Sequence, residues 1–161
     1  MRFASEQMAH LGLTLPPVPE PVAAYVPAVR FSDLVFTSGQ LPLVDGQLKA
    51  VGQVGAAVTP EEAYGCARVA MLNGLAAVAE VTGDLDVVAR VVKVVVYVAS
   101  APGFTGQPQV ANGASDLLGE IFGRAGRHAR SAVGVASLPL DAPVEVELVV
   151  AVGSTPLIHP V

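Results

Sequence analysis

Residues 91–99, VVKVVVYVA, carry valine at both odd and even positions. The side chains of a β-strand alternate between the two faces of its sheet, so apolar residues at both parities indicate a strand that is covered on both sides. β-Branched residues also fit strands better than helices. The stretch therefore predicts a central strand of a sheet that needs a covering layer on each face.

Two helices are predicted, one on each side of this strand in the sequence. Residues 59–62, TPEE, place a threonine at the N-cap, proline at the first helical position and glutamate at the third, which is a capping-box start. This helix is expected to run to about Val81, with Gly83 after its end. Apolar periodicity predicts the second helix over residues 109–122.

Shorter extended segments complete the sheet. Residues 25–30 and 34–37 are expected as strands, with a turn at Asp45-Gly46 after them, and residues 128–152 hold two more strand-like runs. The predicted order is β-β-α-β-α-β-β. This order favours an α+β fold, a mixed β-sheet with two helices packed on one face.

The chain does not supply a layer for the second face of that sheet, so we expect neighbouring copies to cover it. Composition agrees, because 52% of the 161 residues are hydrophobic and only 14% are charged, against averages of about 45–50% and about 25%. The length favours a single domain. We expect a helix over residues 5–12, capped by Ser5, and a proline-rich arm within residues 1–20, a core over 22–152 and a tail over 153–161.

Several classes of protein are disfavoured by the sequence. No apolar run approaches the roughly 20 residues of a membrane helix, and no secretory leader is recognised, which favours a cytoplasmic protein. A net charge of −5 without a cluster of basic residues disfavours nucleic acid as a partner. Cys66 is the only cysteine and is expected to be buried, and the spacing of His10, His128 and His159 predicts no metal site.

Three charged residues lie inside the most apolar segment, HARSAVGVASLPLDAPVEVELVVAV (128–152). Glu145 and Glu147 are expected on one face of the last strand, since they are two residues apart. If residues 131–136 pair antiparallel with that strand, Arg130 comes within reach of one of the glutamates. An ionised group in such a segment needs a partner, so these residues either form a structural ion pair or bind a ligand.

Several short motifs together resemble those of one family. Tyr25-Val26, the stretch TSGQLP (37–42), Asn112, RSAV (130–133) with LP (138–139), and VEVE (144–147) occur in the order seen in the YjgF/YER057c/UK114 family, also called RidA. The best-known members of that family are enamine/imine deaminases. The chain is similar to a longer member with an extended N-terminus. The resemblance implies a chorismate-mutase-like fold of the bacillus type and a homotrimer, a trimeric barrel with ligand clefts between subunits.

The resemblance also implies which residues form the site. Arg130 is expected to hold a substrate carboxylate and Glu145 to position a water, and these are the candidate catalytic residues. Tyr25, Ser38, Gly39 and Asn112 are expected to line the substrate-binding cleft, although Asn112 is also a good residue for capping the second helix.

The implied activity is hydrolysis of reactive 2-imino or 2-enamino acids to 2-keto acids and ammonia, a hydrolase reaction without a metal or organic cofactor. Ala132 stands where many deaminases of the family have a cysteine. The alternative is a non-catalytic trimer that binds a small carboxylate and regulates a partner. Ribonuclease activity, which the resemblance also raises, fits poorly with an acidic chain.

Overall fold

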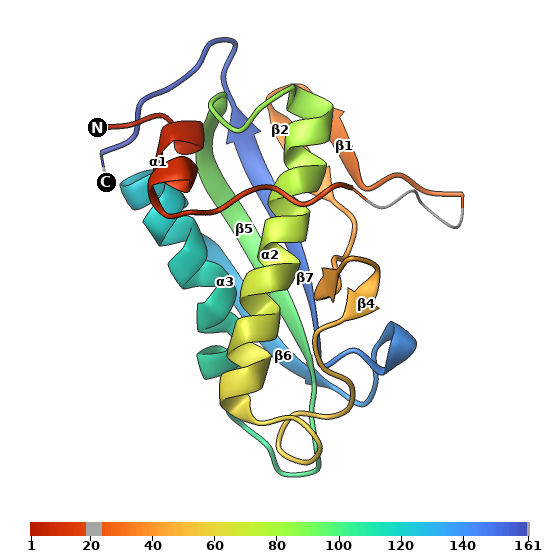
Figure 1. Cartoon of the computed structure of the whole chain (residues 1–161). Coiled ribbons are helices and arrows are strands. Elements are labelled where there is room, and N and C mark those ends of the chain that lie inside the picture. The colour runs from red at the N-terminus through yellow and green to blue at the C-terminus, as the bar shows by residue number, and fades with distance from the viewer. Residues whose placement is uncertain (19–23, 161) are drawn as a thin grey trace.

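The computed structural model describes residues 1–18 and 24–160, so residues 19 and 20 of the predicted proline-rich arm, and the predicted core boundary at residue 22, lie outside the described part. In the described part of the chain, four strands lie between the first and second helices, and one long strand lies between the second and third (Figure 1). The helices are α1 (Ala4–His10), α2 (Pro60–Thr82) and α3 (Gln107–Phe122), and the 3₁₀ turns are η1 (Gly123–Gly126) and η2 (Pro139–Asp141). The strands are β1 (Ala28–Phe31), β2 (Leu34–Thr37), β3 (Leu43–Val44), β4 (Gln47–Leu48), β5 (Val88–Ala99), β6 (Ala129–Val135) and β7 (Val144–Val152).

The main sheet has the strand order β1-β2-β7-β5-β6 and is mixed, because β5 and β6 are parallel while the other neighbours are antiparallel. Helices α2 and α3 lie side by side across one face of it (Figure 1). The predicted mixed sheet with two helices on one face is therefore confirmed. The predicted turn at Asp45-Gly46 joins β3 to β4, and both residues have positive φ, 50° and 78°.

The start of α2 is set by the predicted capping box. Thr59 Oγ1 accepts a hydrogen bond from the Glu62 backbone N–H at 3.2 Å, and the Glu62 carboxylate accepts one from the Thr59 N–H at 2.9 Å. Gly83, with φ of 91°, ends the helix as expected. Within residues 1–18 and 24–160, no helix has the length and apolar character needed to cross a membrane.

The N-terminal helix differs from the prediction in its cap. Helix α1 begins at Ala4, which places Ser5 inside the first turn, where its hydroxyl donates to Asp86 Oδ2 at 2.8 Å. The prediction of Ser5 as the cap was wrong because this serine has a long-range partner. The side chain of Gln7 donates to the Glu120 carbonyl of α3 at 3.0 Å, so α1 is fixed to the core.

The predicted antiparallel pairing of residues 131–136 with the last strand is wrong. Strand β6 pairs only with β5, in parallel, with Val94 opposite Arg130 and Tyr97 opposite Val133, and β7 lies on the other side of β5. Helix α3 connects β5 to β6, and a helical crossover of this kind returns the chain in the parallel direction. Nearness in sequence favoured a hairpin, but the crossover makes β6 an edge strand.

Helices α2 and α3 cover only one face of the sheet. In β7 the side chains alternate strictly: Val144, Val146, Leu148, Val150 and Val152 are buried under the helices, and the residues between them are only half-buried. The second face, which we call the open face, continues onto Phe36, paired with Val149, and onto Val29, paired with Phe36. Phe36 is 43% exposed and Val29 is 53% exposed. The valines at odd and even positions of residues 91–99 predict a covering layer on each face of the sheet, and one chain supplies only one of these two layers.

Candidate functional site

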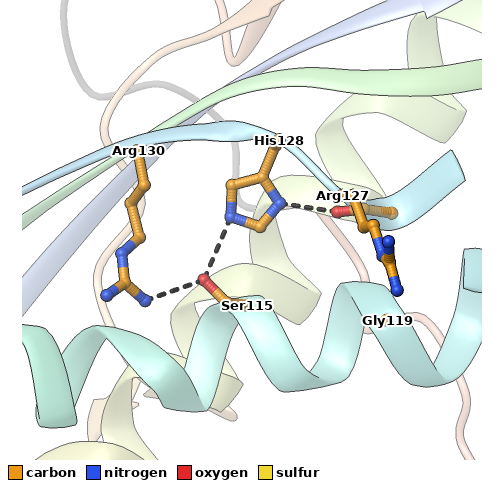
Figure 2. A pocket seen from close by; sticks show the side chains of 6 residues that line it. Ser115, Gly119, Arg127, His128 and Arg130 are labelled. Carbon is orange, nitrogen blue, oxygen red and sulfur yellow. Dashed lines mark hydrogen bonds between the residues drawn. The ribbon is translucent and has the colours of Figure 1, made fainter. Parts of the chain in front are cut away.

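Arg130 points from β6 toward α3, on the helix-covered side of the sheet (Figure 2). Its NH1 group donates to Asn112 Oδ1 at 2.8 Å and to Ser115 Oγ at 3.1 Å, and its NH2 group donates to the Pro108 carbonyl at 3.3 Å. Residues three apart lie on the same face of a helix, which is why Asn112 and Ser115 reach one guanidinium. The structure therefore brings Arg130 together with Asn112, and Asn112 does not cap α3, whose N-cap is Gly106.

A structural ion pair between Arg130 and Glu145 or Glu147 does not form within the described residues. Arg130 is opposite Val94, which is buried beneath the helices, whereas Glu145 is opposite Tyr97 on the open face. The two charges lie on opposite faces of one sheet. A guanidinium has five N–H donors, so the Nε–H of Arg130 and one N–H of NH2 have no hydrogen-bond partner in residues 1–18 and 24–160.

His128 extends the network around Arg130. Its Nδ1 lies 2.6 Å from the Gly126 carbonyl and its Nε2 lies 3.0 Å from Ser115 Oγ. A carbonyl only accepts, so Nδ1 carries the proton, and in the neutral ring Nε2 then accepts from the Ser115 hydroxyl. Burial lowers the pKa of His128, and the nearby positive charge of Arg130 lowers it further, while the hydrogen bond to Gly126 opposes this shift. The lowered pKa favours the neutral ring. Ser115 can thus donate to His128 while it accepts from Arg130.

Ser115 and His128 were not predicted as site residues from the sequence. Two signals pointed to them: Ser115 follows Asn112 by one helical spacing, and His128 stands two residues before Arg130. Neither signal is specific, because a helical serine and a lone histidine are common in proteins without any site. Only the structure shows that the two side chains bond to each other and that Ser115 bonds to the arginine (Figure 2).

Tyr25 and Ser38 belong to a second group of candidate residues. The Ser38 hydroxyl donates to the Val26 carbonyl at 2.6 Å, and the Ser38 N–H donates to the Pro27 carbonyl at 2.8 Å. These bonds hold the segment that carries Tyr25 against the end of β2. The Tyr25 side chain is 55% exposed and so remains accessible to a ligand.

Glu145 and Gly39 complete this second group. Paired backbone hydrogen bonds between Gln40 and Val146, 2.8 and 2.9 Å long, lay the strand end beside Glu145. A Cβ atom on Gly39 would overlap the Glu145 carboxylate, with Cδ only 2.7 Å away, so only glycine leaves room for this carboxyl group. Burial, and then the nearby charge of Glu147, raises the pKa of Glu145. A half-buried carboxyl with a raised pKa is a stronger base than an ordinary carboxylate, which suits it to proton transfer.

The predicted site residues thus form two groups in one chain. The cationic group, Arg130 with Asn112 and Ser115, lies on the helix side of the sheet at its edge strand. The acidic group, Glu145 with Gly39, Ser38 and Tyr25, lies at the other side. Cys66 is buried in α2, where burial raises its pKa. Within the described residues, no three His, Cys, Asp or Glu side chains gather in an arrangement that could hold a metal ion.

Comparison with known proteins identifies relatives over most of the chain. The sequence profile of the family described as "YjgF/chorismate mutase-like, putative endoribonuclease" matches residues 5–152. Protein TCP17 of Trypanosoma cruzi is 46% identical over 144 residues, which cover 89% of this chain and 90% of that protein.

Two crystal structures share the fold. Atu1372 from Agrobacterium tumefaciens, a protein of unknown function, has a TM-score of 0.86 at 40% identity, covering 93% of this chain and 92% of the other. A protein from Shewanella oneidensis with the same endoribonuclease description has a TM-score of 0.90 at 32% identity, covering 94% and 100%.

Proposed function

This chain belongs to the YjgF/chorismate mutase-like family, and on that premise we propose that it hydrolyses reactive 2-imino or 2-enamino acids to 2-keto acids and ammonia. One observation carries the proposal: the chain presents a guanidinium with unused donors and, on the opposite face of the sheet, a carboxyl of raised pKa beside a bare glycine. Each group is half of a site for an imino acid. A second subunit completes it.

The proposed assembly is a homotrimer whose open sheet faces form a closed barrel. Phe31 (75% exposed), Val29 and Phe36 lie on the open face, and an apolar surface of this kind favours association with further copies. In the trimer, the acidic group of one subunit meets the cationic group of the next. Three equivalent clefts result, each with Arg130 and Asn112 from one chain and Tyr25, Ser38, Gly39 and Glu145 of the partner subunit.

Arg130 fixes the substrate in this cleft. Its remaining donors, the Nε–H and one N–H of NH2, grip the substrate carboxylate, while Asn112, Ser115 and the Pro108 carbonyl hold the guanidinium in place. Holding the carboxylate places the adjacent C=N carbon within reach of a water molecule. Positioning of this kind supplies much of the rate increase, because a protonated imine is already electrophilic.

Glu145 of the partner subunit acts on the water. The carboxylate accepts a proton as the water oxygen bonds to the C=N carbon, and the π electrons move to nitrogen, which gives a carbinolamine. Protonation of the amino nitrogen and cleavage of the C–N bond then release ammonia, and the hydroxyl loses its proton to form the keto group. A base whose pKa is raised by burial suits this cycle, because it both accepts and returns a proton.

The alternative proposal is a trimer that binds a small carboxylate and regulates a partner without turnover. It needs Arg130 but does not need Glu145 beside a water. The replacement of the common family cysteine by Ala132 is the feature that favours this alternative.

The test is a coupled assay in which an amino-acid oxidase generates imino acids and their disappearance is followed with the wild type, Arg130→Lys and Glu145→Gln. Lysine keeps the charge but loses the fork, so calorimetric binding of 2-oxobutanoate should weaken by about 1.5–3 kcal/mol. Glu145→Gln should keep binding and lose about 10²- to 10⁴-fold in turnover, because an amide does not accept the proton.

Equal turnover by the three proteins would refute the deaminase proposal. Ligand binding by a wild type that gives no turnover would support the regulatory alternative instead. Unchanged binding by Arg130→Lys would remove the carboxylate clamp from both.

A further inference from the structure

A groove of about 300 Å³ runs between the start of β6 and the surface of α3. Its lining residues are Ser115, Gly119, Gly126, Arg127, His128 and Arg130. Figure 2 shows the side chains of Arg127 and Arg130 on either side of His128, both directed toward α3. The groove therefore begins at the proposed carboxylate clamp and continues toward a second arginine.

The charge in this groove is opposite to that of the chain. The net charge is −5, yet none of the lining residues is acidic and two are arginines. The acidic side chains of α3 are engaged on its other side, where Asp116 accepts from Tyr64 and Glu120 pairs with Arg68. An electropositive hollow of this kind attracts anions.

The Arg127 side chain has no hydrogen-bond partner among the described residues. This side chain is exposed, whereas the Arg130 guanidinium is held by three acceptors. The wall opposite is open, because a Cβ atom built on Gly119 would meet nothing within 4 Å. The groove thus has open space over Gly119 next to the unpaired Arg127 guanidinium, adjacent to the proposed carboxylate clamp.

We propose that this groove binds a second anionic group of the ligand, so that the preferred substrates are 2-imino acids with a side-chain carboxylate or phosphate. Arg130 holds the carboxylate next to the C=N carbon, and Arg127 binds the distal anion over Gly119. The inference rests on the proposed function for the position of the first carboxylate. Arg127 is then the residue that determines specificity, and it takes no part in the chemical step.

The test compares ligands that differ only in the second anion. Calorimetry with 2-oxoglutarate and with 2-oxopentanoate uses the same five-carbon chain, ending in a carboxylate or a methyl group, and 2-oxo-4-phosphonobutanoate tests a phosphonate in that place. The wild type should bind 2-oxoglutarate about 10- to 100-fold more tightly than 2-oxopentanoate, as expected for one charge-assisted hydrogen-bonded pair. Imine turnover from glutamate and from norvaline should show the same preference.

Three variants separate the contributions. Arg127→Gln should remove the preference and leave 2-oxopentanoate binding unchanged. At Gly119 a Cβ atom meets nothing within 4 Å, and leucine is a better helix former than glycine, so Gly119→Leu should place a side chain in the groove and remove the preference in a stable protein. Arg124→Gln removes an exposed positive charge outside the groove and should keep the preference.

The possible outcomes distinguish this inference from the proposed function. Equal wild-type affinity for 2-oxoglutarate and 2-oxopentanoate, or a preference that survives Arg127→Gln, overturns the second anion site but leaves the deaminase proposal standing. If the wild type shows no imine turnover but binds 2-oxoglutarate preferentially, and Arg127→Gln loses that binding preference, the deaminase proposal is overturned and the second anion site is retained. A preference for 2-oxo-4-phosphonobutanoate over 2-oxoglutarate identifies phosphate as the distal group.

Discussion

Ser115→Ala removes the hydroxyl that links Arg130 to His128. In the wild type this hydroxyl accepts from Arg130 NH1 at 3.1 Å and lies 3.0 Å from His128 Nε2. After the change the guanidinium keeps Asn112 and the Pro108 carbonyl as acceptors. The variant therefore loosens Arg130 without releasing it.

The expected cost follows from these contacts. A hydrogen bond to a charged group contributes about 1.5–3 kcal/mol, but Ser115 and His128 are only half-buried, so water replaces part of the lost bond. We expect a destabilisation of about 1 kcal/mol, which lowers the Tm by about 2–4 °C for a chain of this size. Because two acceptors remain, 2-oxobutanoate should bind about 3- to 10-fold more weakly.

Kinetics separate a positioning role from a general loss of stability. The carboxylate clamp acts equally on the bound substrate and on the transition state, so Ser115→Ala should raise KM and leave kcat nearly unchanged. Ser115→Thr keeps a hydroxyl at the same place and serves as the matched control. Unchanged keto-acid affinity and KM in Ser115→Ala would refute the claim that this serine helps to hold Arg130.

Two further predictions concern the acidic group and the histidine. Gly39→Ala places a methyl group where the Glu145 carboxylate lies; since the obstacle is the flexible end of a side chain, the carboxylate should move, so turnover should fall at least 10-fold in the coupled assay with little change in Tm. Burial lowers the pKa of His128 in the folded chain below the ordinary value of 6.5. Between the lowered pKa and 6.5 the unfolded chain binds more protons than the folded chain, so the stability of the fold decreases as the pH drops through that interval. Denaturant titrations at pH 7.5 and pH 5 should show a smaller loss for His128→Gln than for the wild type or the exposed control His10→Gln, and equal losses in all three would contradict this.

Local signals predicted the helices well but failed where strand pairing is decided by distant contacts. The capping box at residues 59–62 and the turn at Asp45-Gly46 act within a few residues, so the sequence contains their full cause. The partner of β6 depends on which edge of β5 is free after α3 crosses over, and β7 occupies the other edge. The prediction therefore paired β6 with β7 incorrectly, because only a short connection separates them in the sequence.

The arrangement of the candidate site could not be predicted from the sequence, although the motifs that carry its residues could be recognised there. The motifs that carry Ser38, Gly39, Arg130 and Glu145 are visible in the sequence, but the alternation of side chains across paired strands decides which face each one reaches. Only the observed pairing shows that Arg130 and Glu145 lie on opposite faces. Ser115 was missed for the same reason, since its role depends on the approach of β6 to α3.

The central claim is that one active site takes Arg130 from one subunit and Glu145 from its neighbour. Co-expression of Arg130→Gln and Glu145→Gln chains with different affinity tags, followed by purification on both tags, isolates trimers that contain both variants. If each site is shared between neighbours, every such trimer has one site with both residues intact, and imine hydrolysis should recover to about one third of the wild-type rate. Activity no higher than that of the two parent variants would show that the site does not combine these residues across subunits and would contradict the account.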